Sequence, residues 1–152
     1  HTMRIFLILL ALLPLALSAQ TDRSDAYLSY IQEKGYPIDT ITDNYIVFTA
    51  DSTVFLMETT TYDFQDFRMV LPGLALIEDQ QMGPVHMAAA NLTSAKMSVV
   101  KVFMEGPSVV ASVELLLEDP TEFSHSFDRS IEMLNTAGMV YYQELGQLMQ
   151  GE

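Results

Sequence analysis

The stretch AAANLTSAKMSVVKVFMEGPSVVASVELLLED, residues 88–119, decides the fold class. It opens with helix-forming residues and continues as an apolar run that breaks at Gly106-Pro107. β-Branched residues are frequent on both sides of the break, as in strands, and Gly-Pro between them predicts a hairpin turn. Lys101 and Glu114 interrupt the two runs, so we expect both side chains on a solvent face. The stretch therefore predicts a helix followed by an antiparallel hairpin.

The rest of the chain likewise divides into strand-like and helix-like segments. NYIVFTADSTVFLMETTT (44–61) predicts two strands joined near residues 50–52, and FRMVL (67–71) predicts a third strand that Pro72-Gly73 ends. Helical spacing is found at residues 24–35, 84–96 and 119–149. Segregated helices and hairpins indicate an α+β, two-layer domain with an antiparallel five-stranded sheet packed by helices, in the order α-βββ-α-ββ-α.

The last helix carries one continuous apolar stripe, in steps of three and four residues. We expect this stripe, and Phe127 and Leu134 in particular, to be buried against the sheet. Its members are Phe123, Phe127, Ile131, Leu134, Gly138, Tyr141, Leu145 and Met149.

The segment EKGYPID (33–39) after the first helix, together with residues 88–119, resembles the YbjN-type family. This family is named for a role in regulating sensory transduction in bacteria, and its fold is similar to that of type III secretion chaperones. The resemblance covers most of the chain and rests on element order and loose motifs. It implies a fold far more strongly than a function, and because similar chaperones are commonly dimeric it favours pairing of two copies.

The first 19 residues have the order of a secretory signal peptide. Arg4 precedes 13 apolar residues, Ile5–Leu17, and the small residues Ser18 and Ala19 follow. Cleavage after Ala19 or after Ser18 fits the pattern. A membrane anchor is the alternative, but 13 residues fall short of the roughly 20 that span a bilayer. We expect residues 1–19 to be a cloning remnant (His1 and Thr2) plus a signal peptide, and residues 20–152 to form one YbjN-like domain. We expect this domain to be exported to the periplasm or beyond the cell, without a stable membrane anchor after cleavage.

The composition excludes several classes of function. The 152 residues include 20 acidic and 7 basic side chains, for a formal net charge of −13. This charge repels phosphate backbones, so we expect no nucleic-acid partner. The chain has no cysteine, which excludes disulfides, thiol catalysis and thiolate metal sites.

Candidate chemical groups are few. His86, Asn91 and Lys96 lie at steps of five residues, and this spacing turns their side chains to different sides of a helix. His125 lies near acidic residues on a helix, which we interpret as an exposed face with local ion pairs. The acids Glu58, Asp63 and Asp66, and Glu78 with Asp79, lack the ligand pattern of a calcium loop. We therefore predict no catalytic, cofactor-binding or metal-binding residues, and no cofactor.

The second helix offers a possible partner surface. Val85, Ala88, Leu92 and Ala95 form its expected core stripe, which leaves Ala89, Ala90 and Thr93 as a strip of small residues. Either a second copy of the chain packs on this strip, or alanine only supplies helix propensity on a solvated face.

The methionine content also bears on binding. The chain has ten methionines, and these can line a peptide-binding surface, although Met69, Met104 and Met133 are expected in the core.

The leading hypothesis is an exported, non-catalytic domain that binds a protein or peptide, in a chaperone-like or regulatory role, and pairing with a second copy is left open. The second is a carrier of a small molecule or lipid, with an apolar pocket between sheet and helices. The third is a hydrolase, which would need two converging titratable groups in a cleft. A deep cavity would favour the carrier, and a filled sheet–helix interface would favour the binding domain.

Overall fold

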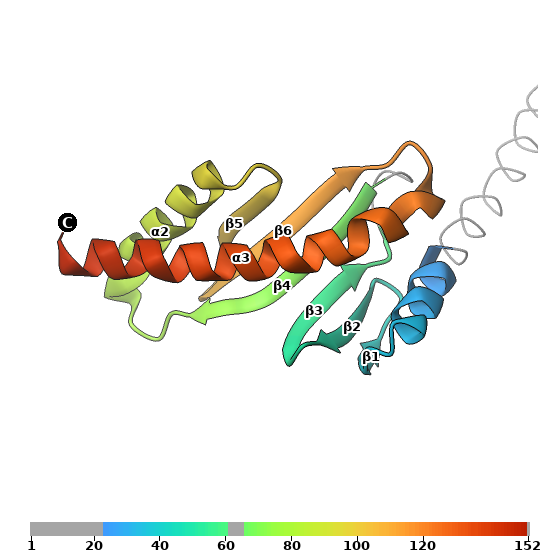
Figure 1. Ribbon diagram of the computed structural model, residues 1–152. Coiled ribbons are helices and arrows are strands. Elements are labelled where there is room, and N and C mark those ends of the chain that lie inside the picture. The colour runs from blue at the N-terminus through green and yellow to red at the C-terminus, as the bar shows by residue number, and fades with distance from the viewer. Residues whose placement is uncertain (1–22, 61–65, 152) are drawn as a thin grey trace, which may run out of the picture.

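A computed structural model describes residues 23–60 and 66–151 of the chain. The predicted signal peptide, Asp63 and the ends of the chain lie outside these residues. The first described element is a helix at residues 23–33 (Figure 1). The later elements are β1 (Ile38–Ile41), β2 (Tyr45–Ala50), β3 (Thr53–Glu58), β4 (Asp66–Leu76), α2 (Gly83–Lys96), β5 (Val100–Glu105), β6 (Ser108–Leu116) and α3 (Phe123–Gln150), with single 3-10 turns before α2 and α3.

The α+β class and the antiparallel sheet are confirmed, but the expected five strands and element order are wrong. The sheet has six strands in the order β1-β2-β3-β4-β6-β5, and four strands separate the first helix from α2. The missed strand, β1, is four residues long, mostly exposed and bulged in its pairing with β2. Such a short edge strand has little apolar pattern from which it could be predicted.

Strand β4 is longer than expected because Pro72 and Gly73 do not end it. The pairing of β4 with β6 shifts register between Leu71 and Ala75, and Gly73 has φ +65°, so the two residues form a bulge inside the strand. Beyond this bulge, β4 turns Leu74 toward α3.

The helices pack on one face of the sheet and form the core with it (Figure 1). Tyr27 and Ile31 of the first helix, Ala89 and Ala90 of α2 and the stripe of α3 all belong to a single cluster of buried residues. The sheet contributes alternate residues of each long strand, such as Ile46, Phe48, Phe55, Met57, Phe67, Met69, Val109, Ala111 and Val113. Alternation places the intervening residues on the opposite face of the sheet, which none of the described helices covers.

The stripe of α3 is confirmed over most of its length. Phe127 and Leu134 are fully buried, and every other predicted member up to Leu145 is buried. Met149 is the exception, because the C-terminal end of α3 reaches past the strands alongside α2 (Figure 1).

Candidate interaction surface

The small residues of α2 face the core, so the expected orientation of this helix is wrong. Ala89, Ala90 and Thr93 are buried within the chain, whereas Leu92 and Ala95 of the expected core stripe are exposed. The hydroxyl of Thr93 donates to the carbonyl of Ala89, so its burial leaves no polar atom without a partner. Small side chains do let another helix approach closely, as expected, but that helix is α3 of the same chain. The strip is not an exposed surface in this structure.

The other two groups of interest on α2 connect it to α3. Nδ1 of His86 lies 2.5 Å from the hydroxyl of Tyr141, and Lys96 forms an ion pair with the buried carboxylate of Glu144. Asn91 is exposed, whereas His86 and Lys96 both contact α3, at Tyr141 and Glu144, so the expected spread of the three side chains around the helix holds for Asn91 only. Burial, with a smaller effect of Tyr142, raises the pKa of Tyr141 to about 12.

The region around His125 forms one long-range and one local ion pair. His125 is exposed, and its neighbours Asp128 and Arg129 pair with Lys34 and Glu132. Within residues 23–60 and 66–151, no three histidine or acidic side chains lie close enough to hold a metal ion. In the same part of the chain, no helix is both long and apolar enough to cross a membrane.

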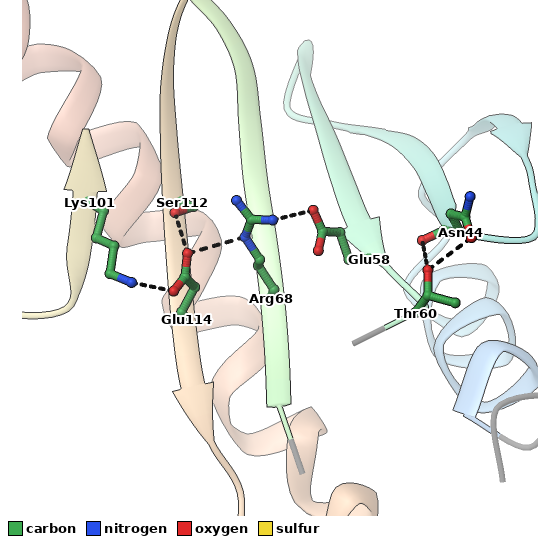
Figure 2. A network of polar contacts seen from close by, with 7 residues as sticks. All are labelled: Asn44, Glu58, Thr60, Arg68, Lys101, Ser112 and Glu114. Carbon is green, nitrogen blue, oxygen red and sulfur yellow. Dashed lines mark hydrogen bonds and ion pairs between the residues drawn. The ribbon is translucent and has the colours of Figure 1, made fainter. Parts of the chain in front are cut away.

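A row of charges crosses the uncovered face of the sheet. Arg68 on β4 contacts Glu58 on β3 at 2.5 Å and Glu114 on β6 at 3.2 Å, and Lys101 on β5 pairs with the other oxygen of Glu114 (Figure 2). Burial acts to raise the pKa of Glu114, but the hydrogen bond and charge of Lys101, together with Arg68, hold this pKa below its usual value. Ser112 also donates to Glu114, at 3.2 Å.

The charges of this row are paired within it, although Nε of Arg68 contacts Glu114 without the alignment of a hydrogen bond. It contains two cations and two anions, each facing an opposite charge on a neighbouring strand, which is the arrangement that stabilises cross-strand pairs. The expected solvent exposure of Lys101 and Glu114 is confirmed. The uncovered face is therefore stabilised by pairs within the chain.

The outer edge of the sheet at β5 is closed by α2. The N–H of Val102 donates to Oγ of Ser94 at 2.7 Å, and the same hydroxyl donates to the carbonyl of Val102 at 3.1 Å. Glu105 and Ser108 flank the two-residue turn at Gly106-Pro107 and form the first pair of the hairpin. Hydrogen-bonded and non-bonded pairs alternate along antiparallel strands, so Val102, three residues before Glu105, belongs to a non-bonded pair. Its main-chain N–H and C=O therefore point away from β6. Ser94 thus occupies the position where a further strand would bond.

The C-terminal half of α3 combines exposed apolar side chains with an absence of exposed charge. Residues 134–151 contain one acidic or basic residue, Glu144, which is buried and paired with Lys96. Met139, Tyr142 and Met149 are exposed by 68%, 54% and 63%. Together with Gly146 they lie within an arc of about 80° on the helix, since each residue turns it by about 100°. We call these four residues the neutral surface.

The neutral surface has a fixed shape at its centre. The hydroxyl of Tyr142 donates to the main-chain carbonyl of Leu74, which holds the ring against the end of β4. A side chain added at Gly146 would meet nothing within 4 Å, so the space at this position is open, and we call this gap in the row of side chains the notch. Sequence reasoning missed the surface because it assigned Met149 to the core stripe and did not consider Met139 and Tyr142. The sequence did contain a signal for this surface, namely the single acidic or basic residue within residues 134–151.

The methionines divide between core and surface. Met69 is fully buried, and Met104 and Met133 are half-buried against the core, in agreement with their expected positions. Met139 and Met149 are among the exposed large apolar side chains.

Comparisons with known proteins give a fold. No family model matches the chain, and no curated protein matches it. Among solved structures, YbjN of E. coli matches with a TM-score of 0.58 and 14% identity, over 84% of this chain and 92% of that chain. An uncharacterised protein of Methanothermobacter thermautotrophicus matches with a TM-score of 0.60 and 9% identity, over 82% and 97% of the two chains.

A third match is to the Yersinia pestis type III secretion chaperone SycH, in complex with a fragment of YscM2. It has a TM-score of 0.44 and 14% identity, over 76% of this chain and 98% of that chain. The resemblance of the fold to YbjN is therefore confirmed. At these identities the matches show the fold alone.

Proposed function

We propose that this chain is an exported, non-catalytic binding domain, and that its partner is a polypeptide which binds at the neutral surface. The observation that carries the proposal is the contrast in charge. A chain with a net charge of −13 has a helical half without exposed charge, and three large apolar side chains are exposed there. Interface cores are depleted in charged residues and enriched in methionine and aromatic residues.

Two other surfaces of the described residues are less suited to a partner. Strand addition at β5 would have to displace Ser94 from both main-chain groups of Val102. The uncovered sheet face carries the row of charges from Glu58 to Lys101, and a partner there would have to desolvate four charged groups that already have partners. Neither cost arises at the neutral surface.

The carrier hypothesis is disfavoured by the packing between sheet and helices. The rings of Tyr27 and Phe123 lie 4.7 Å apart, centre to centre, and those of Phe48 and Phe127 lie 5.5 Å apart. Side chains thus fill the layer in which a ligand would have to lie, and this filling supports the binding domain.

The hydrolase hypothesis has less support. A hydrolase needs two titratable groups that are free to act on a substrate. His86 and Tyr141 approach each other, but they bond to one another in the contact between α2 and α3.

Export is part of the proposal and rests on the sequence of residues 1–19. Mass spectrometry of the protein recovered outside the cytoplasm should give a mature chain that starts at Ala19 or Gln20. An intact Met3 in fully exported protein would contradict it.

The binding proposal is tested by comparing two charged variants as bait on the proteins of the cell envelope. Met139→Lys places a charge on the neutral surface, at the end nearest the middle of α3. Leu116→Lys places the same charge on the most exposed large apolar residue, at the end of β6, and serves as the control. We expect the wild type and Leu116→Lys to retain the same polypeptide and Met139→Lys to lose it by at least about tenfold, because a buried unpaired charge opposes binding. Equal recovery with both variants would overturn the proposal.

A further inference from the structure

We propose that the polypeptide which binds the neutral surface is a second copy of this chain, packed antiparallel so that Tyr142 of each copy fills the notch at Gly146 of the other. This inference rests on the proposed function, because it names the partner of the same surface. Three properties of α3 support it, namely the spacing of its residues, the open space at Gly146 and the charge of the chain.

The spacing of the neutral surface is self-complementary. In an antiparallel pair of helices related by a two-fold axis, position i of one copy faces position j of the other when i and j are equally far from the axis. An axis at the level of residue 144 sets Tyr142 opposite Gly146 and Met139 opposite Met149. Tyr142, the largest side chain of the surface, then faces Gly146, which has no side chain. The two-fold axis produces this contact twice, once from each copy.

Gly146 is the position that makes this packing possible. Glycine within a helix costs about 1 kcal/mol relative to alanine, and Gly146 lies well before the end of α3. Among the described residues, and apart from the adjoining backbone of α3 itself, no atom lies within 4 Å of the place where a Cβ would be, so packing within the described part of one copy does not require glycine there. Gly138 differs, because a Cβ at that position would lie 3.2 Å from the side chain of Leu74. The space at Gly146 is open to a neighbour.

Charge favours a copy that approaches by this surface. Two chains of net charge −13 repel each other, and the repulsion is weakest where the facing surfaces carry no charge. On the surface of α3, the charged residues Asp128, Arg129 and Glu132 precede residue 134, outside the proposed contact. The glutamines Gln143, Gln147 and Gln150 are exposed beside the neutral surface and supply polar contacts without charge.

The size of the surface sets the expected affinity. At side-chain areas of about 200 Å², the exposed parts of Met139, Tyr142 and Met149 present roughly 350–400 Å² per copy. Stable interfaces bury about 800 Å² per partner, so the flanking residues must contribute as much again. We therefore expect a dimer whose dissociation constant lies in the micromolar range.

Sedimentation velocity of the full-length chain, from about 1 to 200 μM, tests this inference. We expect a concentration-dependent monomer–dimer equilibrium. Gly146→Gln fills the notch and should weaken the dimer at least tenfold, while it leaves the fold intact because glutamine is a better helix former than glycine. Thr136→Gln is the matched control, an exposed position on α3 outside the neutral surface, and it should dimerise like the wild type.

A covalent test reports the orientation of the two helices. The chain has no cysteine, so Met139→Cys with Met149→Cys introduces the only two thiols. Ten residues of helix separate them by about 15 Å within one copy, too far for a disulfide, whereas the antiparallel pair brings them together. Oxidation should yield a covalent dimer.

The inference is overturned by a wild type that stays monomeric over the whole range, or by a Gly146→Gln variant that dimerises as well as the wild type. If the wild type is monomeric but Met139→Lys loses a different envelope protein that the wild type retains, the partner is not a second copy. The proposed function would then still hold. If Met139→Lys changes neither property, both proposals fail.

Discussion

Truncation of Phe127 to alanine should remove a large part of the stability of this domain. The side chain has no exposed surface, and its ring centre lies 5.1 Å from Tyr30, 5.5 Å from Phe48 and 6.5 Å from Tyr36. Phenylalanine-to-alanine changes in cores cost about 3–5 kcal/mol, and aromatic pairs add about 0.5–1.5 kcal/mol each beyond area burial. The measured cost of such a truncation already includes the loss of ring contacts, so the three contacts place Phe127 at the upper end of the range, and we expect the free energy of unfolding to fall by about 4–5 kcal/mol, out of a typical total of about 5–15 kcal/mol.

Equilibrium denaturation in urea, followed by far-ultraviolet circular dichroism, measures this loss as a shift of the midpoint at constant slope. Phe103→Ala is the matched control, because Phe103 is half-buried on the sheet face that the described helices leave uncovered, and it should cost much less. A loss below about 1 kcal/mol for Phe127→Ala, or equal losses for both variants, would refute the assignment of α3 as the element that closes the core.

Three further changes test contacts of α2. The free energy of unfolding should fall as the pH rises from about 10 to 12, because folded Tyr141 keeps its proton up to a pKa of about 12 while the unfolded chain releases it near 10. The melting temperature of Tyr141→Phe should therefore depend less on pH in this window than that of the wild type. Ala90→Glu should cost several kcal/mol in thermal melts, because it buries an unpaired charge, whereas exposed Asn91→Glu should cost less than about 0.5 kcal/mol. Ser94→Ala should speed hydrogen exchange at the amide of Val102, and unchanged exchange would contradict the edge contact.

Elements with a strong period were predictable from the sequence. The stripe of α3 recurs over 28 residues, and the hairpin around Gly106 combines β-branched runs with turn residues. Both signals come from residues whose burial follows from their chemistry alone. The short β1 and the bulge at Pro72-Gly73 depend on pairing with neighbouring strands, and no local pattern reports such pairing.

The orientation of α2 could not be predicted for a different reason. Alanine is compatible with both a core and a surface position, so a helix rich in alanine has almost no amphipathic pattern. The sequence rule then places Leu92 inward because it is large. In the structure, the close approach of α3 selects the small residues Ala89 and Ala90, and Leu92 is left outside.

The neutral surface lies between these cases. Its apolar residues were visible in the sequence, but Met149 was assigned to the core because the length of the supporting sheet was unknown. The lack of charge over residues 134–151 was countable without a structure. Charge depletion on a predicted amphipathic helix is therefore a signal for a contact surface that hydrophobic periodicity alone misses.

The contact between Ser94 and Val102 also has a consequence for the order of folding. Until α2 is in place, the strand Val100–Glu105 is an apolar edge that can join another unfolded or partly folded chain. The two residues are only eight positions apart, and loops of about ten residues close in roughly 10–100 ns. Encounters between chains at micromolar concentration are far slower than this. The edge is thus exposed for a short time, and refolding yield should depend on chain concentration mainly in variants that delay the last turn of α2, where Ser94 lies.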